Sequence, residues 1–321
     1  MLAAHGALAE QIRSGLVETR HDGAVAVVGP DGSLIASSGD IDSPFFIRSS
    51  AKPFQAIVSR EFGADLDSVE MAMACASHRG FPVQVALVRG MLASAGLDES
   101  ALRCPPSWPL GADAVRVVLG EGATEPRPIW NNCSGKHAGF LRACVASGWP
   151  TETYLAPEHP LQRRVIELVS ELGGYSVEPV GVDGCGAPVL RTTTRVMAHL
   201  FARLATEPRL SPALEAMHRY PALVGGNGEG DTEIAIALNA AVKAGAAGCV
   251  GVAVENRFGI AVKSWDGLGG VANVGAVSAL EQLGALTPTA AAALGPVARP
   301  PVFGGGGAVG HFESRLRLDM A

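Results

Sequence analysis

The sequence predicts an α+β fold, on three observations. Strand-like segments lie near both ends of the chain, helix-like segments fill its middle, and no internal repeat divides it. Strands that flank a helical middle are expected to share one sheet, with helices against it and a helical lobe beside it. We therefore expect a single domain with two lobes over residues 1–321.

Composition narrows the classes of protein to consider. The chain has 321 residues, of which 48% are hydrophobic and 17% charged, with a net charge of -6. Such a chain can bury a sizeable core without disulfides, and its hydrophobicity argues against disorder. Its Lys and Arg residues are scattered, which argues against nucleic acid or an anionic lipid surface as partner. A small molecule is the expected partner.

The start of the chain lacks the pattern of a signal peptide, and no apolar run approaches the roughly 20 residues of a membrane span. The sequence therefore predicts a cytoplasmic protein without a membrane partner. In that compartment the six cysteines are expected to be buried thiols or metal ligands.

Two elements are expected near the N-terminus. Leu8, Ile12 and Leu16 recur at a spacing of four residues, which predicts an amphipathic helix. Residues 22–36 place two apolar runs around Gly-Pro-Asp-Gly, which predicts a β-hairpin.

The middle of the chain reads as helical. A short extended segment at 45–47 leads into an expected helix over 50–60, where Pro53 falls in the first turn and is tolerated. A helical stripe over 161–172 ends at Gly173-Gly174, a typical C-terminal stop.

Strands are expected again toward the C-terminus. A further helix after Asp231 is expected to place Ile234, Leu238 and Val242 on one face. Beyond it, the apolar runs 249–254 and 259–263 predict two strands of a hairpin.

Ser49 and Lys52 form an S-x-x-K pair where the extended segment turns into a helix. Three-residue spacing puts both side chains on one helical face, so a neutral lysine could remove the serine proton and create a nucleophile. The alternative is a helix cap with a solvated lysine.

Two further residues resemble parts of serine-enzyme machinery. Ser77 follows an apolar helical segment, and Lys263 ends an apolar strand before Ser-Trp-Asp-Gly, much as K-T-G does in penicillin-recognising enzymes. Each has an alternative interpretation, a capping serine or a solvated lysine. Their order along the chain, after S-x-x-K, is more informative than either residue alone.

Two glycine-rich polar turns carry potential metal ligands. Spacing alone nominates Cys133, His137 and Cys185 as a zinc site completed by water. The alternative is two buried cysteines and a hydrogen-bonded histidine.

Taken together, these segments resemble the Rhizobium-type L-asparaginases, also called asparaginase II or class 3. The segments that carry the resemblance are Ser49-Ser50-Ala51-Lys52-Pro53-Phe54-Gln55, Cys75-Ala76-Ser77-His78, Asn131 to Gly139, His159-Pro160-Leu161-Gln162, Asp183-Gly184-Cys185-Gly186 and Lys263 to Gly267. The resemblance implies a fold like that of serine β-lactamases, penicillin-binding proteins and glutaminases. It also implies one catalytic domain, a homodimer, and hydrolysis of L-asparagine to L-aspartate and ammonia.

The resemblance further implies roles for individual residues. Ser49 with Lys52, and Ser77 with Lys263, match the family's two Ser-Lys pairs. Its zinc ligands match Cys133, Lys136 and Cys185, which replaces His137 as the third ligand, while Arg48, His137 and Asp183 become substrate-side groups. Because a charged ammonium has no lone pair to give, zinc has to displace the proton of Lys136, and the site should weaken as pH falls.

The sequence departs from the family pattern near Phe81, Pro105, Ala247 and Gly269. These departures avoid the Ser-Lys pairs and the ligands but leave substrate preference open. Two other functions therefore remain: a serine amidohydrolase of another amide, such as glutamine or a β-lactam, and a non-catalytic protein that binds zinc or an amino acid.

Overall fold

The computed structural model describes residues 6–321, and the chain divides into two compact units. Unit 1 comprises the chain up to residue 50 together with residues 192–207 and 227–321, and unit 2 comprises residues 51–191 and 208–226. Segments from both ends of the chain thus build unit 1. The single catalytic domain with two lobes stays a prediction.

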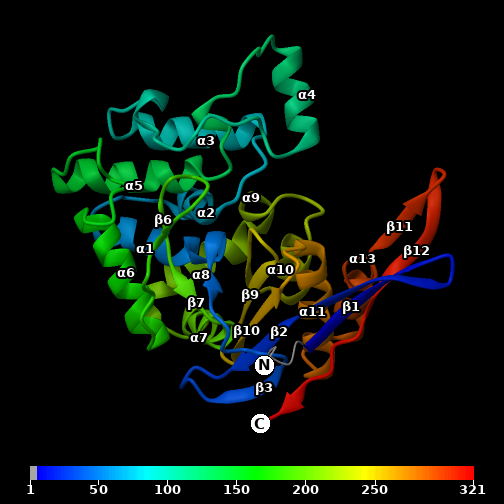
Figure 1. Cartoon of the computed structure of the whole chain (residues 1–321). Coiled ribbons are helices and arrows are strands. Elements are labelled where there is room, and N and C mark those ends of the chain that lie inside the picture. The colour runs from blue at the N-terminus through cyan, green and yellow to red at the C-terminus, as the bar shows by residue number, and fades with distance from the viewer. Residues whose placement is uncertain (1–5) are drawn as a thin grey trace. The chain divides into compact units, whose positions relative to one another are not determined.

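Unit 1 contains a sheet whose strands come from both ends of the chain (Figure 1). Its described strands pair antiparallel in the order β11-β12-β1-β2-β10-β9-β8, with β3 beside β2 and β13 beside β3. They are β1 (Gly6–Arg13), β2 (Leu16–Val28), β3 (Leu34–Ser38), β8 (Ala241–Gly245), β9 (Cys249–Val254), β10 (Phe258–Ser264), β11 (Pro301–Gly304), β12 (Gly307–Ser314) and β13 (Asp319–Met320). The predicted α+β fold with a shared sheet is confirmed.

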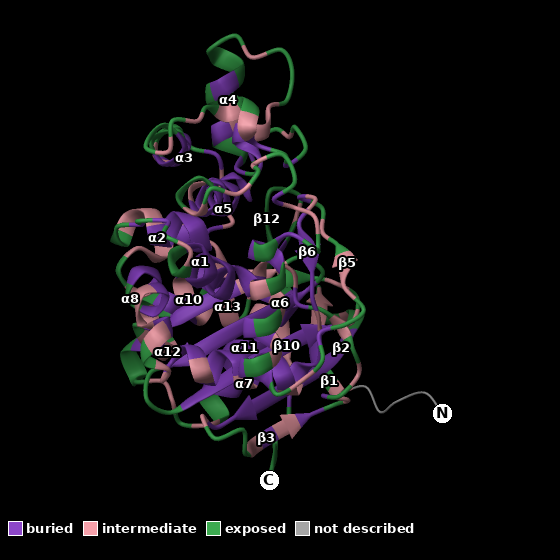
Figure 2. Ribbon diagram, turned by 90° about the vertical axis from the view of Figure 1, so that its left-hand side faces the viewer, coloured by how far each residue is buried: buried purple, intermediate pink, exposed green. Residues whose placement is uncertain are grey.

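Helices cover both faces of the unit 1 sheet. Alternate residues of β10 point to opposite faces, so they show which helix packs on each face. Ile260 and Val262 join the apolar core that α11 (Gly269–Gln282) completes. Gly259 faces α7 (Thr194–Leu204), where a Cβ would lie 2.0 Å from the carbonyl oxygen of Ala198. Only glycine permits this close approach, and both the strand and α11 are largely buried (Figure 2).

The remaining described elements of unit 1 are short. They are β4 (Phe45–Phe46), the 3₁₀ helix η1 (Arg48–Ala51), α10 (Gly230–Leu238), α12 (Pro288–Ala293) and α13 (Gly295–Ala298). The last residue of η1 already belongs to unit 2, because the boundary between the units follows Ser50.

Unit 2 is mainly helical. Its described elements are α1 (Lys52–Glu61), α2 (Ser68–Cys75), α3 (Pro82–Ala93), η2 (Glu99–Ala101), α4 (Ala112–Gly120), η3 (Pro128–Trp130), α5 (Ser134–Ser147), α6 (Pro160–Gly173), the hairpin strands β5 (Gly181–Val182) and β6 (Pro188–Val189), η4 (Pro208–Leu210), α8 (Ser211–Arg219) and α9 (Pro221–Val224). The two-residue strand β7 (Arg191–Thr192) lies at the boundary between the units. None of the helices in residues 6–321 is long and apolar enough to cross a membrane.

The predicted N-terminal helix is wrong. Its stripe, Leu8, Ile12 and Leu16, lies instead in β1 and at the start of β2. A spacing of four residues is also an even number, so Leu8 and Ile12 fit a strand as well as a helix, while Leu16 lies beyond a turn in the next strand. Pairing of β1 with β2 and with β12 decides the conformation, and Leu16 is 72% exposed rather than part of a buried stripe.

Most other predicted elements are confirmed, including the hairpin over 22–36, the helix ending at Gly173 and the strands 249–254 and 259–263. The helix after Asp231 is shorter than expected. It ends at Leu238 because Asn239 adopts a left-handed conformation, and Val242 lies in β8.

Candidate active site

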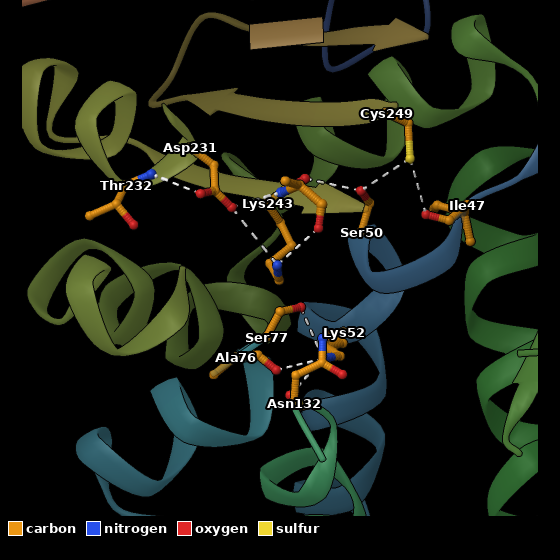
Figure 3. A network of polar contacts seen from close by, with 11 residues as sticks. Ile47, Ser50, Lys52, Ala76, Ser77, Asn132, Asp231, Thr232, Lys243 and Cys249 are labelled. Atoms are coloured by element: carbon orange, nitrogen blue, oxygen red, sulfur yellow. Dashed lines mark hydrogen bonds and ion pairs between the residues drawn. The ribbon is translucent and has the colours of Figure 1, made fainter. Parts of the chain in front are cut away.

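Lys52 is the first residue of α1 and is 1% exposed. Its Nζ lies 2.6 Å from the carbonyl oxygen of Ala76, 3.1 Å from Ser77 Oγ and 3.4 Å from the carbonyl oxygen of Asn132. Figure 3 shows these groups gathered around the amine. All four residues belong to unit 2.

This arrangement suits proton exchange between Lys52 and Ser77. A neutral amine has two N–H groups and one lone pair, and an ammonium has three N–H groups. The two carbonyl oxygens can accept two N–H groups in either state, since a carbonyl only accepts. The third position of the amine faces Ser77 Oγ, so the lone pair of neutral Lys52 can accept the hydroxyl proton of Ser77.

The backbone leaves Ser77 as the accessible member of its segment. α2 ends at Cys75, and the Ser77 N–H donates to the carbonyl of Val224 at 2.8 Å. Ala76 and His78 on either side are buried, whereas Ser77 is partly exposed. A group that takes a proton from Lys52 and also reaches solvent can pass that proton on.

His78 is fully buried beside this lysine. Its Nδ1 accepts from the Gly80 N–H at 3.1 Å, so its Nε2 carries the proton and donates to Ser134 Oγ at 2.8 Å. Burial, reinforced by the positive charge of Lys52, lowers the pKa of His78 to about 3. The histidine is therefore a neutral structural link between the Ser77 segment and α5.

We expect the stability of the protein to fall in mild acid because His78 must fold uncharged. The unfolded chain takes up a proton at this histidine below a pKa of about 6.5, while the folded chain does so only near 3. The free energy of unfolding should fall by about 1.4 kcal/mol per pH unit through this group between those values, on top of other groups' effects. Urea unfolding at pH 6.5 and 4.5 should show a drop about 2 to 3 kcal/mol smaller in His78→Gln; equal drops would contradict this role.

Cys133, Lys136 and Cys185 converge within unit 2. Lys136 Nζ donates to Cys185 Sγ at 3.1 Å, and the two cysteines are hydrogen-bonded to each other. All three side chains are buried, and both thiols are free of disulfides. The three proposed zinc ligands therefore meet at one place.

The charges in this cluster are mutually adjusted. The hydrogen bond from Cys185 holds the pKa of Cys133 well below its ordinary value, whereas the pKa of Cys185 is raised by the same bond and by burial. Burial acts to lower the pKa of Lys136, but the neighbouring sulfurs outweigh it and raise the value. These shifts favour the thiolate form of Cys133 and the ammonium form of Lys136.

Two sulfurs and an amine are donors that suit zinc once the proton of Lys136 has left. No group of three or more His, Cys, Asp or Glu side chains within residues 6–321 is placed to hold a metal. The ligand set that the resemblance implies, with Lys136 as its third member, stays a prediction.

Local backbone conformation explains the two motifs that carry these ligands. Asp183 to Gly186 form the turn between β5 and β6, closed by the Gly186 N–H donating to the Asp183 carbonyl at 2.8 Å. Gly186 has φ 85°, which favours glycine. At Gly135, in the first turn of α5, a Cβ would lie 2.4 Å from the carbonyl oxygen of Met73, so glycine lets α5 approach α2.

His137 is fully buried. Its Nδ1 lies 2.7 Å from Tyr154 Oη, so this nitrogen is hydrogen-bonded to the tyrosine rather than directed at the two cysteines. Tyr154 Oη accepts from the Arg103 N–H at 3.0 Å, so its own hydrogen is directed to Nδ1. His137 then carries its proton on Nε2, which has no hydrogen-bond partner in the described structure. Burial and the charge of Lys136 keep the pKa of His137 well below its ordinary value, so this group is a neutral donor.

Arg48 and Ser49 lie in η1 of unit 1. Arg48 has φ 52°, a left-handed conformation that is unusual for a residue other than glycine. Both side chains are partly exposed. The turn thus presents Ser49 directly after a strained residue, a feature that clusters at functional sites.

Lys263 lies in β10 of unit 1 and is 6% exposed. Its Nζ donates to the carbonyls of Ala247 at 2.7 Å and Ser264 at 2.5 Å, and lies over the rings of Phe45 and Trp265. Burial lowers the pKa of this lysine, which favours the neutral form that proton transfer requires.

With this geometry in place, comparison with known proteins assigns the family. A family model described as L-asparaginase II matches residues 9–314, which is nearly the whole chain. The chain belongs to the L-asparaginase II family. No curated protein sequence matches it significantly.

Solved structures that resemble this L-asparaginase II family member agree only in coarse architecture. They include the native form of Mglu (16% identity, TM-score 0.44, covering 82% of this chain and 64% of that one), a probable glutaminase, ybaS (17%, 0.43, 82% and 85%), and a Bacillus glutaminase (12%, 0.41, 81% and 90%). The chain spans about two thirds of the length of Mglu. These likenesses carry no further inference.

At two of the departures of this L-asparaginase II family member from the family pattern, Ala247 and Pro105, the backbone rather than the side chain makes the contact. Ala247 lies in the β8–β9 turn with φ 62°, and its carbonyl, not its side chain, meets Lys263. Pro105 accepts a hydrogen bond from Asn131 Nδ2 through its carbonyl, which any residue could supply. Phe81 precedes α3, and Gly269 begins α11.

The sequence of this L-asparaginase II family member did not point to Tyr154, which lies against His137. Its neighbours along the chain give no signal, but the His159-Pro160-Leu161-Gln162 segment was a usable one, because Gln162 Nε2 donates to the Tyr154 carbonyl at 2.8 Å. The motif thus supports the tyrosine that orients His137.

Proposed function

We propose that this L-asparaginase II family member hydrolyses the side-chain amide of L-asparagine to L-aspartate and ammonia. The observation that carries the proposal is the position of the buried Lys52 amine. Two carbonyl groups hold it so that its third position faces the Ser77 hydroxyl. Such a lysine is suited to move protons to and from hydroxyl groups, which is the chemistry that acyl transfer needs. Membership of the L-asparaginase II family indicates an amide as the substrate of this chemistry.

In the proposed mechanism Ser49 is the nucleophile and Lys52, three residues on, is its base. The hydroxyl proton of Ser49 moves to neutral Lys52 while Oγ forms a bond to the amide carbon. The carbon–nitrogen bond then breaks, and the leaving nitrogen receives the proton from Lys52 by way of the Ser77 hydroxyl. Lys263 is proposed to assist Ser77 in this transfer. Water attacks the resulting ester, releases L-aspartate and restores Ser49.

Three groups are proposed to bind the amino-acid part of the substrate. Arg48 offers paired donors to the α-carboxylate, and Asp183 offers an acceptor to the α-ammonium, because opposite charges and paired hydrogen bonds suit these groups. His137, neutral and with an unsatisfied Nε2–H, adds a donor for a substrate oxygen.

Zinc is proposed as a cofactor held by Cys133, Lys136 and Cys185. When bound, the ion would act as a Lewis acid and would tie the α5 start to the β5–β6 turn. These ligands flank Asp183 and His137 in sequence, so the cluster fixes the backbone that carries both proposed substrate contacts. A homodimer in the cytoplasm is part of the same proposal, on the resemblance alone.

The proposal is tested by measuring ammonia release from L-asparagine and L-glutamine, each with and without a zinc chelator. We expect faster turnover, as kcat/KM, on asparagine. A preference for glutamine would indicate a glutaminase on the same Ser-Lys machinery. Binding of asparagine without turnover at any pH would instead favour a non-catalytic amino-acid binding protein.

A further inference from the structure

The turn that presents Ser49 is fastened to the β8–β9 hairpin by a small buried cluster within unit 1. We call this the Ser50 cluster, and it consists of Ile47, Ser50, Lys243 and Cys249. Ser50 is fully buried, and Cys249 is 2% exposed. Figure 3 shows Ser50 between the Lys243 carbonyl and the Cys249 sulfur.

Hydrogen bonds join both sides of the turn to the hairpin. Ser50 Oγ donates to the Lys243 carbonyl at 3.0 Å, and Cys249 Sγ donates to the Ile47 carbonyl at 3.6 Å. Ser50 Oγ and Cys249 Sγ are 3.8 Å apart. The same Ile47 carbonyl also accepts from the Ser50 N–H at 3.3 Å, which closes the turn around Arg48 and Ser49.

The turn needs this fastening because Arg48 is in the left-handed region, with φ 52°. A residue other than glycine persists there only when its surroundings hold it. The two residues that flank the pair, Ile47 and Ser50, are the ones that the hairpin binds. Releasing them would let Arg48 relax and would move Ser49.

Gly245 of β8 makes room for the cluster. A Cβ on this residue would lie 2.6 Å from Cys249 Sγ, 2.9 Å from the Ile47 carbonyl oxygen and 3.0 Å from Ser50 Oγ. No side chain larger than hydrogen fits between these atoms. The Ser49 turn, β8 and β9 thus meet at one tightly packed point.

The hairpin side of the cluster is itself held in place. The Asp231 carboxylate accepts from the Ala244 N–H at 3.1 Å and lies 3.9 Å from Lys243 Nζ, and that amine donates to the Ala244 carbonyl at 2.9 Å. The acceptor for Ser50 is therefore part of a braced strand end, rather than a mobile loop.

We infer that Ser50 and Cys249 are positioning residues, which hold the strained Arg48 turn so that Ser49 is set for attack on the substrate. This inference rests on the proposed function, in which Ser49 is the nucleophile. It assigns a positioning role to Ser50, and also to Cys249, which is not one of the proposed zinc ligands.

The test compares Ser50→Ala with Ser59→Ala. Ser59 is also buried and donates to one backbone carbonyl, that of Gln55, but it belongs neither to the Ser50 cluster nor to the proposed site residues. We expect Ser50→Ala to lower kcat about 100-fold with KM changed less than about threefold, because the nucleophile is misplaced while binding groups remain. Ser59→Ala should keep kcat within about threefold of wild type.

Two further variants keep the inference testable if Ser50→Ala fails to fold. Cys249→Ala removes the donor to Ile47 and should lower kcat about tenfold, while Cys249→Ser supplies a hydroxyl to the same carbonyl and should recover most of it. Gly245→Ala inserts a methyl group into the cluster and should slow turnover as Ser50→Ala does.

Binding and acylation separate a positioning role from general damage. Single-turnover formation of the acyl-enzyme should slow in Ser50→Ala, while the Kd for L-aspartate stays as in wild type. Wild-type acylation rates in the folded Ser50, Cys249 and Gly245 variants, with Ser49→Ala inactive, would overturn the inference and leave the proposed function intact. Activity in Ser49→Ala would instead overturn the assignment of the nucleophile.

Discussion

Ser49→Ala is expected to abolish ammonia release from L-asparagine, with a loss of at least about 1,000-fold in kcat. Alanine has no hydroxyl to form the ester, so the covalent route closes entirely. The substitution removes one partly exposed oxygen atom, and the protein should remain folded. The measurement is steady-state ammonia release, with circular dichroism and Tm as checks on folding.

Ser77 is the rival nucleophile, because its Oγ lies 3.1 Å from Lys52 Nζ. Acid-quenched digests of the wild-type enzyme, analysed by mass spectrometry, should carry the aspartyl ester on the peptide containing Ser49. Ser77→Ala should slow ammonia departure but still permit some ester to form on Ser49. An ester on Ser77, or near wild-type turnover by Ser49→Ala, would reverse the two roles.

Cys133→Ser is expected to reduce bound zinc to background. A serine hydroxyl does not lose its proton near neutral pH, whereas the pKa of the Cys133 thiol is already held well below its ordinary value, so the thiolate is ready to bind a metal. Elemental analysis of the purified protein after equilibration with zinc measures the occupancy directly, whatever the effect on turnover.

Cys144→Ser is the matched control for the metal site. Cys144 is also buried, but burial raises the pKa of its thiol to about 11, so it is protonated near neutral pH. This variant should hold as much zinc as the wild-type protein. Full occupancy in Cys133→Ser, or equal loss in both variants, would contradict the proposed ligand set.

Much of the candidate site could be predicted from local sequence. Gly174 and Gly186 have positive φ, and Pro53 lies in the first turn of α1, so each position has a conformational requirement that few residues satisfy and that a short motif reveals. The two cysteine turns and the S-x-x-K pair were recognisable because their chemistry needs particular residue types at particular spacings.

Other features depend on partners that are distant in sequence. The spacing of Leu8 and Ile12 fits a helix and a strand equally well, and pairing with β12, about 300 residues away, decides between them. The tautomer of His137 depends on Tyr154, whose hydroxyl is directed by the Arg103 backbone. Neither outcome has a signal within its own segment.

The family, the α+β class and the residue types available for chemistry can be read from the amino-acid sequence, because motifs and turn residues act over short spans of chain. Which of those groups meet depends on how the chain folds. Folding places Lys52 Nζ beside Ser77 Oγ and Lys136 Nζ beside Cys185 Sγ. It also binds Ser50 to the β8–β9 hairpin. These contacts join segments separated by 25, 49 and 193 residues, and hydrogen bonds at such separations exist only once packing has brought the segments together.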